Sequence, residues 1–114
     1  MLKKVQNQTP VLHLNLKSKW FEMILNGEKT EEYREIKPYW SRILTPYIKI
    51  KGKSYHPTDV NICFSNGYSK DRKQIIMECS GLFIREGNSE WGATPGETYY
   101  VLTLGKTIRK AAND

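Results

Sequence analysis

Cysteine and histidine are scarce in this chain, with two of each among 114 residues. Cys63 and Cys79 lie far apart and form no Cys-x-x-Cys pair, and His13 and His56 stand alone, so no zinc set or Ser-His arrangement is indicated. A domain of this size buries roughly two-thirds of the surface of its unfolded chain, enough to fold without disulfides or a structural metal. We therefore expect both cysteines to be reduced core thiols, and we expect no metal and no cofactor.

Long hydrophobic runs are also missing. No stretch approaches the roughly 18 to 20 apolar residues that a membrane-spanning helix needs. The first eight residues, Met-Leu-Lys-Lys-Val-Gln-Asn-Gln, are too polar for a signal peptide. These absences predict a soluble, cytoplasmic protein with no membrane partner.

Negative charge is in the minority. The chain carries 18 Lys and Arg against 12 Asp and Glu, a formal net charge of +6, and its overall composition is that of one globular domain. Long-range attraction favours an anionic partner, and we expect RNA or a nucleotide, although the charge says nothing about the fold or the oligomeric state.

The first part of the chain predicts a strand, a short helix and a second strand. Residues 11–16 alternate, with a leucine at every second position, as in a half-buried strand. Ser18 is the predicted N-cap of a helix that runs to Leu25, and Gly27 is expected to end this helix in the left-handed conformation. The strand expected over residues 30–36 is unusually polar, because four of its seven residues are charged. Core packing alone therefore does not explain the composition of this strand.

The remainder predicts one more helical piece and then mainly strands. Pro38 opens the helical piece, and Pro46 ends it. Residues 48–57 are basic and contain turn residues, so we expect an exposed connection with room for one short edge strand. Further strands are expected over the following ranges: 60–64, 74–84 with a bulge or bend at Gly81, and 98–104.

This order of elements predicts an α+β fold built on a mixed β-barrel, open or closed, of about five to six strands with one or two short helices near the N-terminal half. We expect residues 1–10 to form a polar lead-in and residues 11–108 to form the domain. Residues 109–114 are expected to be a fraying tail.

One segment carries a recognisable motif. Gly27, Lys29, Glu32 and Arg34 stand at the four positions of the pattern Gly-x-Lys-x-x-Glu-x-Arg, after a predicted helix and at the start of a predicted strand. In this motif the chain resembles the ASCH family. The aromatic helix before the motif, and a late Glu-Trp-Gly loop that leads into a Tyr-Tyr-Val strand, extend the resemblance over residues 11–108. The resemblance implies a small stand-alone ASCH domain with a PUA-like β-barrel, which binds RNA or a nucleotide in a cleft around the motif.

The motif residues can also be interpreted by strand geometry. Side chains two positions apart share one face of a strand, so Glu32 and Arg34 project together, and the carboxylate can orient the guanidinium toward a phosphate or a base edge. Lys29 joins them only if the turn after Gly27 interrupts the alternation, and we then expect Lys29 and Arg34 to contact a phosphate or a base edge while Glu32 orients Arg34. The alternative is a surface ladder of salt bridges, which contributes at most about 1 kcal/mol per exposed pair and has no function.

Three further residues are candidates for the same site. Trp40 is expected either to stack on a base or to cover the core. Glu90 and Trp91 lie in a glycine-flanked loop, where functional residues concentrate. We therefore include all three among the predicted ligand-binding residues.

Catalysis is the second hypothesis, since relatives within the superfamily differ in activity. At least one subgroup is an amidohydrolase that acts on acetylated cytidine, and its motif resembles Gly-x-Lys-Thr-x-Thr-x-Arg, with a catalytic threonine at the position of Glu32. A carboxylate cannot replace a hydroxyl nucleophile unchanged. Lys29 as a base, with Glu32 or Glu90 as a proton carrier, could still hydrolyse a modified nucleoside or RNA. A third hypothesis is a protein-interaction module, encoded on a phage-like or mobile element, whose basic surface binds an acidic protein.

Overall fold

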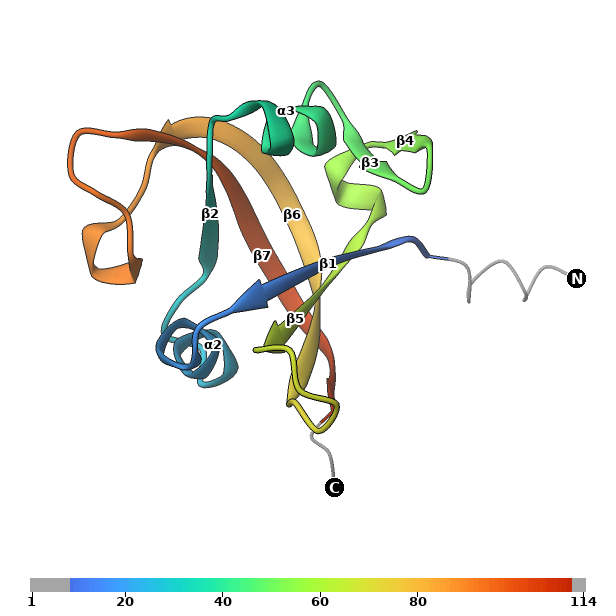
Figure 1. The fold of residues 1–114 in the computed structure, drawn as a ribbon, viewed down its shortest axis with the longest axis vertical. Coiled ribbons are helices and arrows are strands. Elements are labelled where there is room, and N and C mark those ends of the chain that lie inside the picture. Colours follow the sequence, from blue (N-terminus) through green and yellow to red (C-terminus); the bar gives the residue numbers. More distant parts are fainter. Residues whose placement is uncertain (1–8, 112–114) are drawn as a thin grey trace, which may run out of the picture.

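In the computed structural model, which describes residues 9–111, five strands form one mixed sheet in the order β1-β5-β6-β7-β2 (Figure 1). β1 and β5 run parallel, and every other neighbouring pair is antiparallel. The bounds of these strands are β1 (Val11–Leu16), β2 (Glu31–Glu35), β5 (Asn61–Asn66), β6 (Gln74–Glu86) and β7 (Thr98–Ala111).

Two α-helices and a small hairpin complete the fold. The helices are α2 (Ser18–Leu25) and α3 (Pro38–Leu44), and the hairpin consists of β3 (Ile48–Ile50) and β4 (Lys53–Tyr55). Two 3-10 turns, η1 (Pro57–Asp59) and η2 (Ser89–Trp91), lie in the connections. The predicted α+β class, with both helices in the N-terminal half, is confirmed. Within residues 9–111, neither helix is long and apolar enough to cross a membrane.

The predicted barrel is not confirmed. β1 and β2 are the outer strands of the five-stranded sheet, and no strand ladder joins them among the described residues. The sheet nevertheless curves strongly along β6 and β7 (Figure 1). One guanidinium nitrogen of Arg34 on β2 donates a hydrogen bond of 3.1 Å to the carbonyl oxygen of Asn15 on β1. A side chain therefore bridges the two outer strands where the backbone does not.

The helix α2 follows the prediction except at its first residue. Phe21 and Ile24 are buried, as the helical spacing of its apolar residues requires. The predicted cap was wrong: Lys17 is the N-cap residue and makes no side-chain cap, while the Ser18 hydroxyl donates to the Asn66 side chain at 3.1 Å. Gly27 ends the helix at φ +84°, as predicted.

Residues 48–57 differ from the exposed connection that we predicted. They contain the β3–β4 hairpin, and Ile48 is fully buried in the core. Lys51 and Gly52 form its two-residue turn, both with positive φ (+50° and +80°), as a tight hairpin turn requires. The sequence did not predict the hairpin because the segment is rich in lysine and, of its strand residues, only Ile48 is fully buried.

The two long strands extend further than their sequence pattern indicated. β6 continues through Gly81, where register shifts against β7 confirm the predicted bulge or bend. β7 continues past its predicted end at Leu104 and pairs with β6 up to Ala111. The expected tail therefore begins inside a strand; its last part, residues 112–114, and most of the expected lead-in, residues 1–8, lie outside the described residues.

The core lies between the concave sheet and the helices. The three alternating leucines of β1 are buried, as predicted, together with Phe64 and Ile75, which are fully inaccessible. Cys63 and Cys79 are free and buried, as predicted. Two charged side chains are also buried, Lys29 and Glu32, and both belong to the motif.

Candidate functional site

The end of α2 places Lys29. The Glu28 amide donates to the Met23 carbonyl at 2.9 Å and the Gly27 amide to the Ile24 carbonyl at 3.1 Å, the two bonds of a Schellman motif. The Lys29 amide also donates to Met23 at 2.9 Å. This tight reversal turns the chain before β2 begins and leaves Lys29 almost fully buried.

Lys29, Glu32 and Arg34 form one ion-paired cluster, which we call the motif cluster. The Lys29 ammonium lies 2.7 Å from Oε1 of Glu32, and a guanidinium nitrogen of Arg34 lies 3.0 Å from Oε2 of the same carboxylate. The ammonium also donates to the carbonyl oxygen of Glu31. Glu32 therefore holds both cations, one with each oxygen, in a largely buried position.

The structure shows on which face of β2 Lys29 lies, which strand geometry alone did not determine. Glu32 and Arg34 share a face, as expected from their spacing. Lys29 joins them because the Schellman turn interrupts the alternation that would have placed it on the other side. The three motif residues converge, which a surface salt-bridge ladder would not require.

Burial dominates the electrostatics of Lys29. Loss of hydration disfavours the charged ammonium and lowers its pKa, and the nearby Glu32 carboxylate opposes this shift without cancelling it. The Arg34 guanidinium lowers the pKa of Lys29 further. The site thus contains a lysine whose proton is held less tightly than that of an exposed lysine.

Arg34 is held from several sides. Besides Glu32, its guanidinium contacts the Asn15 carbonyl oxygen, and the carbon of the guanidinium lies 4.9 Å from the centre of the Trp40 ring. Such cation–π stacking orients a guanidinium plane. Trp40, on α3, is partly buried and also packs against the core. Trp40 therefore covers part of the core and also presents an aromatic ring beside a motif residue.

Two buried polar atoms beside this contact lack a hydrogen-bond partner among residues 9–111. They are Nε of Arg34, a donor, and Oδ1 of Asn15, an acceptor. Buried polar groups without partners are uncommon and call for an explanation. Asn15 was absent from the sequence-based candidates, because its place on the polar side of an alternating strand is unremarkable. Only the curvature of the sheet brings it to Arg34.

The Glu-Trp-Gly loop lies beside the motif cluster without contacting it. Gly92 approaches the Trp20 indole so closely that a Cβ there would lie 3.1 Å from it, and the Asn88 amide donates to the Tyr33 hydroxyl at 2.9 Å. Glu90 is exposed, and its carboxylate makes no hydrogen bond or ion pair with any described residue; Trp91 is half-buried. Neither side chain reaches Lys29, Glu32 or Arg34 through a hydrogen bond, an ion pair or a ring contact in the described part of the chain.

A second polar network occupies the other face of β2. The Glu31 carboxylate accepts hydrogen bonds from the Tyr33 hydroxyl at 2.7 Å and from Arg85 at 2.8 Å. Partial burial raises the pKa of Glu31, but the hydrogen bonds from Arg85 and Tyr33 outweigh it and leave the pKa below its ordinary value. Burial raises the pKa of Tyr33. This network fastens β2 to β6 and to the loop after β6.

The chain matches no protein-family model, no curated protein and no solved structure. Membership of the ASCH family therefore stays a prediction from the motif. Within residues 9–111, no three side chains of His, Cys, Asp or Glu gather as a potential metal site.

Proposed function

We propose that the chain is an ASCH-type domain that binds RNA or a nucleotide at the motif cluster. Four motif residues support the family, and the Arg34 bridge between the outer strands supports a PUA-like, barrel-like closure of the sheet. The net charge of +6 favours a polyanionic ligand.

The observation that carries the proposal is the surroundings of Arg34. Its guanidinium is oriented by Glu32 and by the Trp40 ring, and its Nε donor lies unpartnered within the described residues, near the unpartnered Oδ1 acceptor of Asn15. The exposed part of the Arg34 guanidinium, beside the Trp40 ring, suits a phosphate or the edge of a stacked base. Nε of Arg34 and Oδ1 of Asn15 are buried, so they pair with a ligand only once its binding opens this contact. A structural salt bridge alone has no need of unpartnered atoms.

The motif residues differ in burial, and this difference assigns them different roles in binding. Arg34, with a side chain 17% exposed, and Trp40 are the residues that contact the ligand. Lys29 is too deeply buried to contact a ligand in this arrangement, so it holds Glu32, which in turn orients Arg34. This refines the initial expectation that Lys29 itself touches a phosphate.

The test is binding of a fluorescent single-stranded RNA to Arg34 variants. Arg34→Ala should abolish binding while circular dichroism shows an intact fold, and Arg34→Lys should restore little, since an ammonium lacks the planar fork. Arg85→Ala is the matched control, because it also removes an ion-paired arginine beside β2. Unchanged affinity of Arg34→Ala would refute the site.

Hydrolysis of a modified nucleoside or of RNA is the second candidate, and the lowered pKa of Lys29 favours it. A buried lysine with a lowered pKa beside a carboxylate suits a general base, provided that the substrate opens a path to it. Glu32 is in place as the proton carrier, whereas Glu90 would have to approach from its exposed loop.

Incubation with acetylated cytidine and with short RNAs, comparing the wild type with Lys29→Ala, tests this candidate. Products that depend on Lys29 would establish an enzyme. If the wild type forms no more product than the variant, only the binding function is left.

A further inference from the structure

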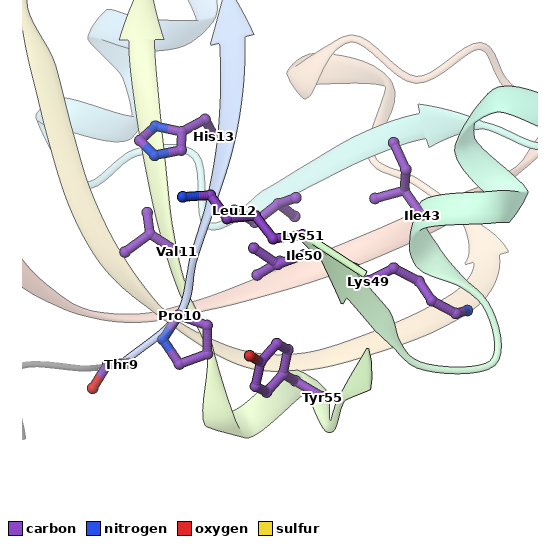
Figure 2. Close-up of a pocket in the computed structure, with 10 residues that line it drawn as sticks. All are labelled: Thr9, Pro10, Val11, Leu12, His13, Ile43, Lys49, Ile50, Lys51 and Tyr55. Carbon is purple, nitrogen blue, oxygen red and sulfur yellow. The ribbon is translucent and has the colours of Figure 1, made fainter. Parts of the chain in front are cut away.

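A separate cleft of about 540 Å³ lies between β1 and the β3–β4 hairpin (Figure 2). Residues 9–13 line one side, residues 49–51 line the other, and Ile43 of α3 and Tyr55 of β4 complete it. It shares no residue with the motif cluster, with Asn15 or with Trp40.

The cleft opens along the edge of β1. Neighbouring residues of a strand point to opposite faces, so a surface on one face is lined by every second residue. Here three consecutive residues of β1, 11–13, contribute to the lining, together with Thr9 and Pro10 just before the strand. β1 pairs only with β5 in the described sheet, so the edge at the cleft is the one without a strand partner.

Two hydrogen bonds establish which main-chain groups of β1 lie on that edge. The Asn61 amide donates to the Pro10 carbonyl, so the even-numbered residues of β1 point their main-chain groups at β5. Arg34 reaches the Asn15 carbonyl from outside the ladder, so the odd-numbered residues point away. The amide and carbonyl groups of Val11 and His13 therefore face the cleft.

The hairpin presents a second strand edge to the same space. Ile50 and Lys53 flank a two-residue turn, so they form its hydrogen-bonded pair, and the next pair, Lys49 with Ser54, is a non-hydrogen-bonded one. The main-chain groups of Lys49 therefore point away from β4. Both Lys49 and Ile50, neighbours on β3, line the cleft, which agrees with an edge rather than a face.

The side chains around the cleft are cationic and apolar. Its described lining contains Lys49, Lys51 and His13 but no carboxylate. The Lys49 ammonium donates to the Thr45 carbonyl at 2.7 Å, which holds this charge in place. Ile50 supplies an apolar contact between the two lysines (Figure 2).

We propose that this cleft binds an extended, acidic peptide segment of a partner protein, which adds as a strand to the edge of β1. Strand addition uses main-chain hydrogen bonds for affinity and alternate side chains for specificity, and both are provided here. The peptide pairs with Val11 and His13, and its acidic side chains lie against Lys51. The Lys49 ammonium points away from β1 and stays bonded to the Thr45 carbonyl (Figure 2). The proposal is independent of the RNA-binding function.

Other occupants fit these features less well. A nucleic acid suits the positive charge but has no main chain to pair with a strand edge. The first eight residues of the chain contain two lysines and no carboxylate, and a second copy carries the same net charge of +6, so both are repelled by the lysines.

The experiment measures binding of two fluorescent peptide pools by anisotropy. One pool contains peptides of about ten residues that alternate Glu with Val, Ile, Thr or Phe, a length that covers an ordinary strand. The other pool has Lys in place of Glu. The acidic pool should bind and the basic pool should not.

Paired variants separate main-chain from side-chain contributions. Compared with His13→Ala, His13→Pro removes the amide that faces the cleft and fixes φ, which edge strands tolerate, and it should weaken binding about tenfold or more. His13→Ala keeps that amide and should bind nearly as well as the wild type. Lys51→Asn should weaken binding about threefold to tenfold and fold normally, since Asn tolerates positive φ. Lys70→Asn, an equal charge change in the exposed loop after β5, should have no effect.

Several results would overturn the proposal. These are equal binding of the two pools or no binding of the acidic pool, wild-type affinity of His13→Pro, and equal effects of Lys51→Asn and Lys70→Asn. Displacement of the peptide by oligouridylate, with the same dependence on Lys51, would assign the cleft to RNA. Dimerisation that His13→Pro abolishes would assign the edge to a second copy.

Discussion

Glu32 is the residue on which the motif cluster depends, and Glu32→Gln tests this directly. Its carboxylate is the ion-pair partner of both Lys29 and Arg34, and the Lys29 and Glu32 side chains are only 1% and 9% exposed. Gln preserves the volume but leaves the buried ammonium without its counter-charge. Removing one partner of a buried pair costs about 3–5 kcal/mol, because the remaining charge is uncompensated.

The loss should depend on pH through Lys29. Burial already lowers the pKa of Lys29, and removal of Glu32 removes the main opposing influence, so the pKa falls further. Between this folded-state pKa and the unfolded value near 10.4, the unfolded chain binds more protons, so the free energy of unfolding rises with pH. The deficit of the variant should therefore be largest near neutral pH and shrink as the pH approaches 10.

The assay is urea unfolding followed by circular dichroism, at about pH 7 and at about pH 9.5, both below the unfolded-state pKa of lysine near 10.4. Glu31→Gln is the control, since it is the same substitution one residue earlier. Its partner Arg85 is 44% exposed, and such a pair contributes about 1 kcal/mol or less. If both variants lose similar stability, or if the deficit of Glu32→Gln is unchanged at high pH, the account of a buried charge cluster is wrong.

Three further predictions concern the helix end, the core and the thiols. Gly27→Ala should cost about 1–2 kcal/mol in urea unfolding, because φ is +84° and an added Cβ meets no atom within 4 Å, so the cost is purely conformational; a neutral substitution would contradict the Schellman geometry. Phe64→Ala should cost about 3–5 kcal/mol, since the ring is fully buried, and a loss below about 1 kcal/mol would show that the core can collapse around it. Burial raises the pKa of Cys63 and Cys79, so a thiol reagent should label them at a rate that follows unfolding, and rapid labelling of the folded protein would contradict their placement.

Several features of the site follow from local sequence. Gly27 ends the helix because a residue without a Cβ adopts positive φ freely, and Glu32 and Arg34 share a face because strands repeat every two residues. The scarcity of cysteine and the strand-like surroundings of Cys63 and Cys79 predicted buried thiols. Each of these inferences needs only residues within a few positions of one another.

Other features were decided by contacts between distant segments. The turn that brings Lys29 to Glu32 is local, but the burial of Lys29 depends on the packing of α2 and β2, and Trp40 reaches Arg34 through the docking of α3. Asn15 meets Arg34 because β1 and β2, at opposite ends of the strand order, are brought together by curvature along β6 and β7. Glu90, which the loop composition favoured, is held away from the cluster.

The sequence by itself therefore determined most of the elements and their order, apart from the β3–β4 hairpin, and the residues of the motif. The tertiary structure alone decided that Lys29, Glu32 and Arg34 form one buried ion-paired cluster, and that a strand edge with two lysines borders a second cleft. The physical reason is that helix ends and strand alternation depend on neighbouring residues. Sheet order, curvature and burial depend on pairings across the whole chain, such as β1 with β5 and β7 with β2.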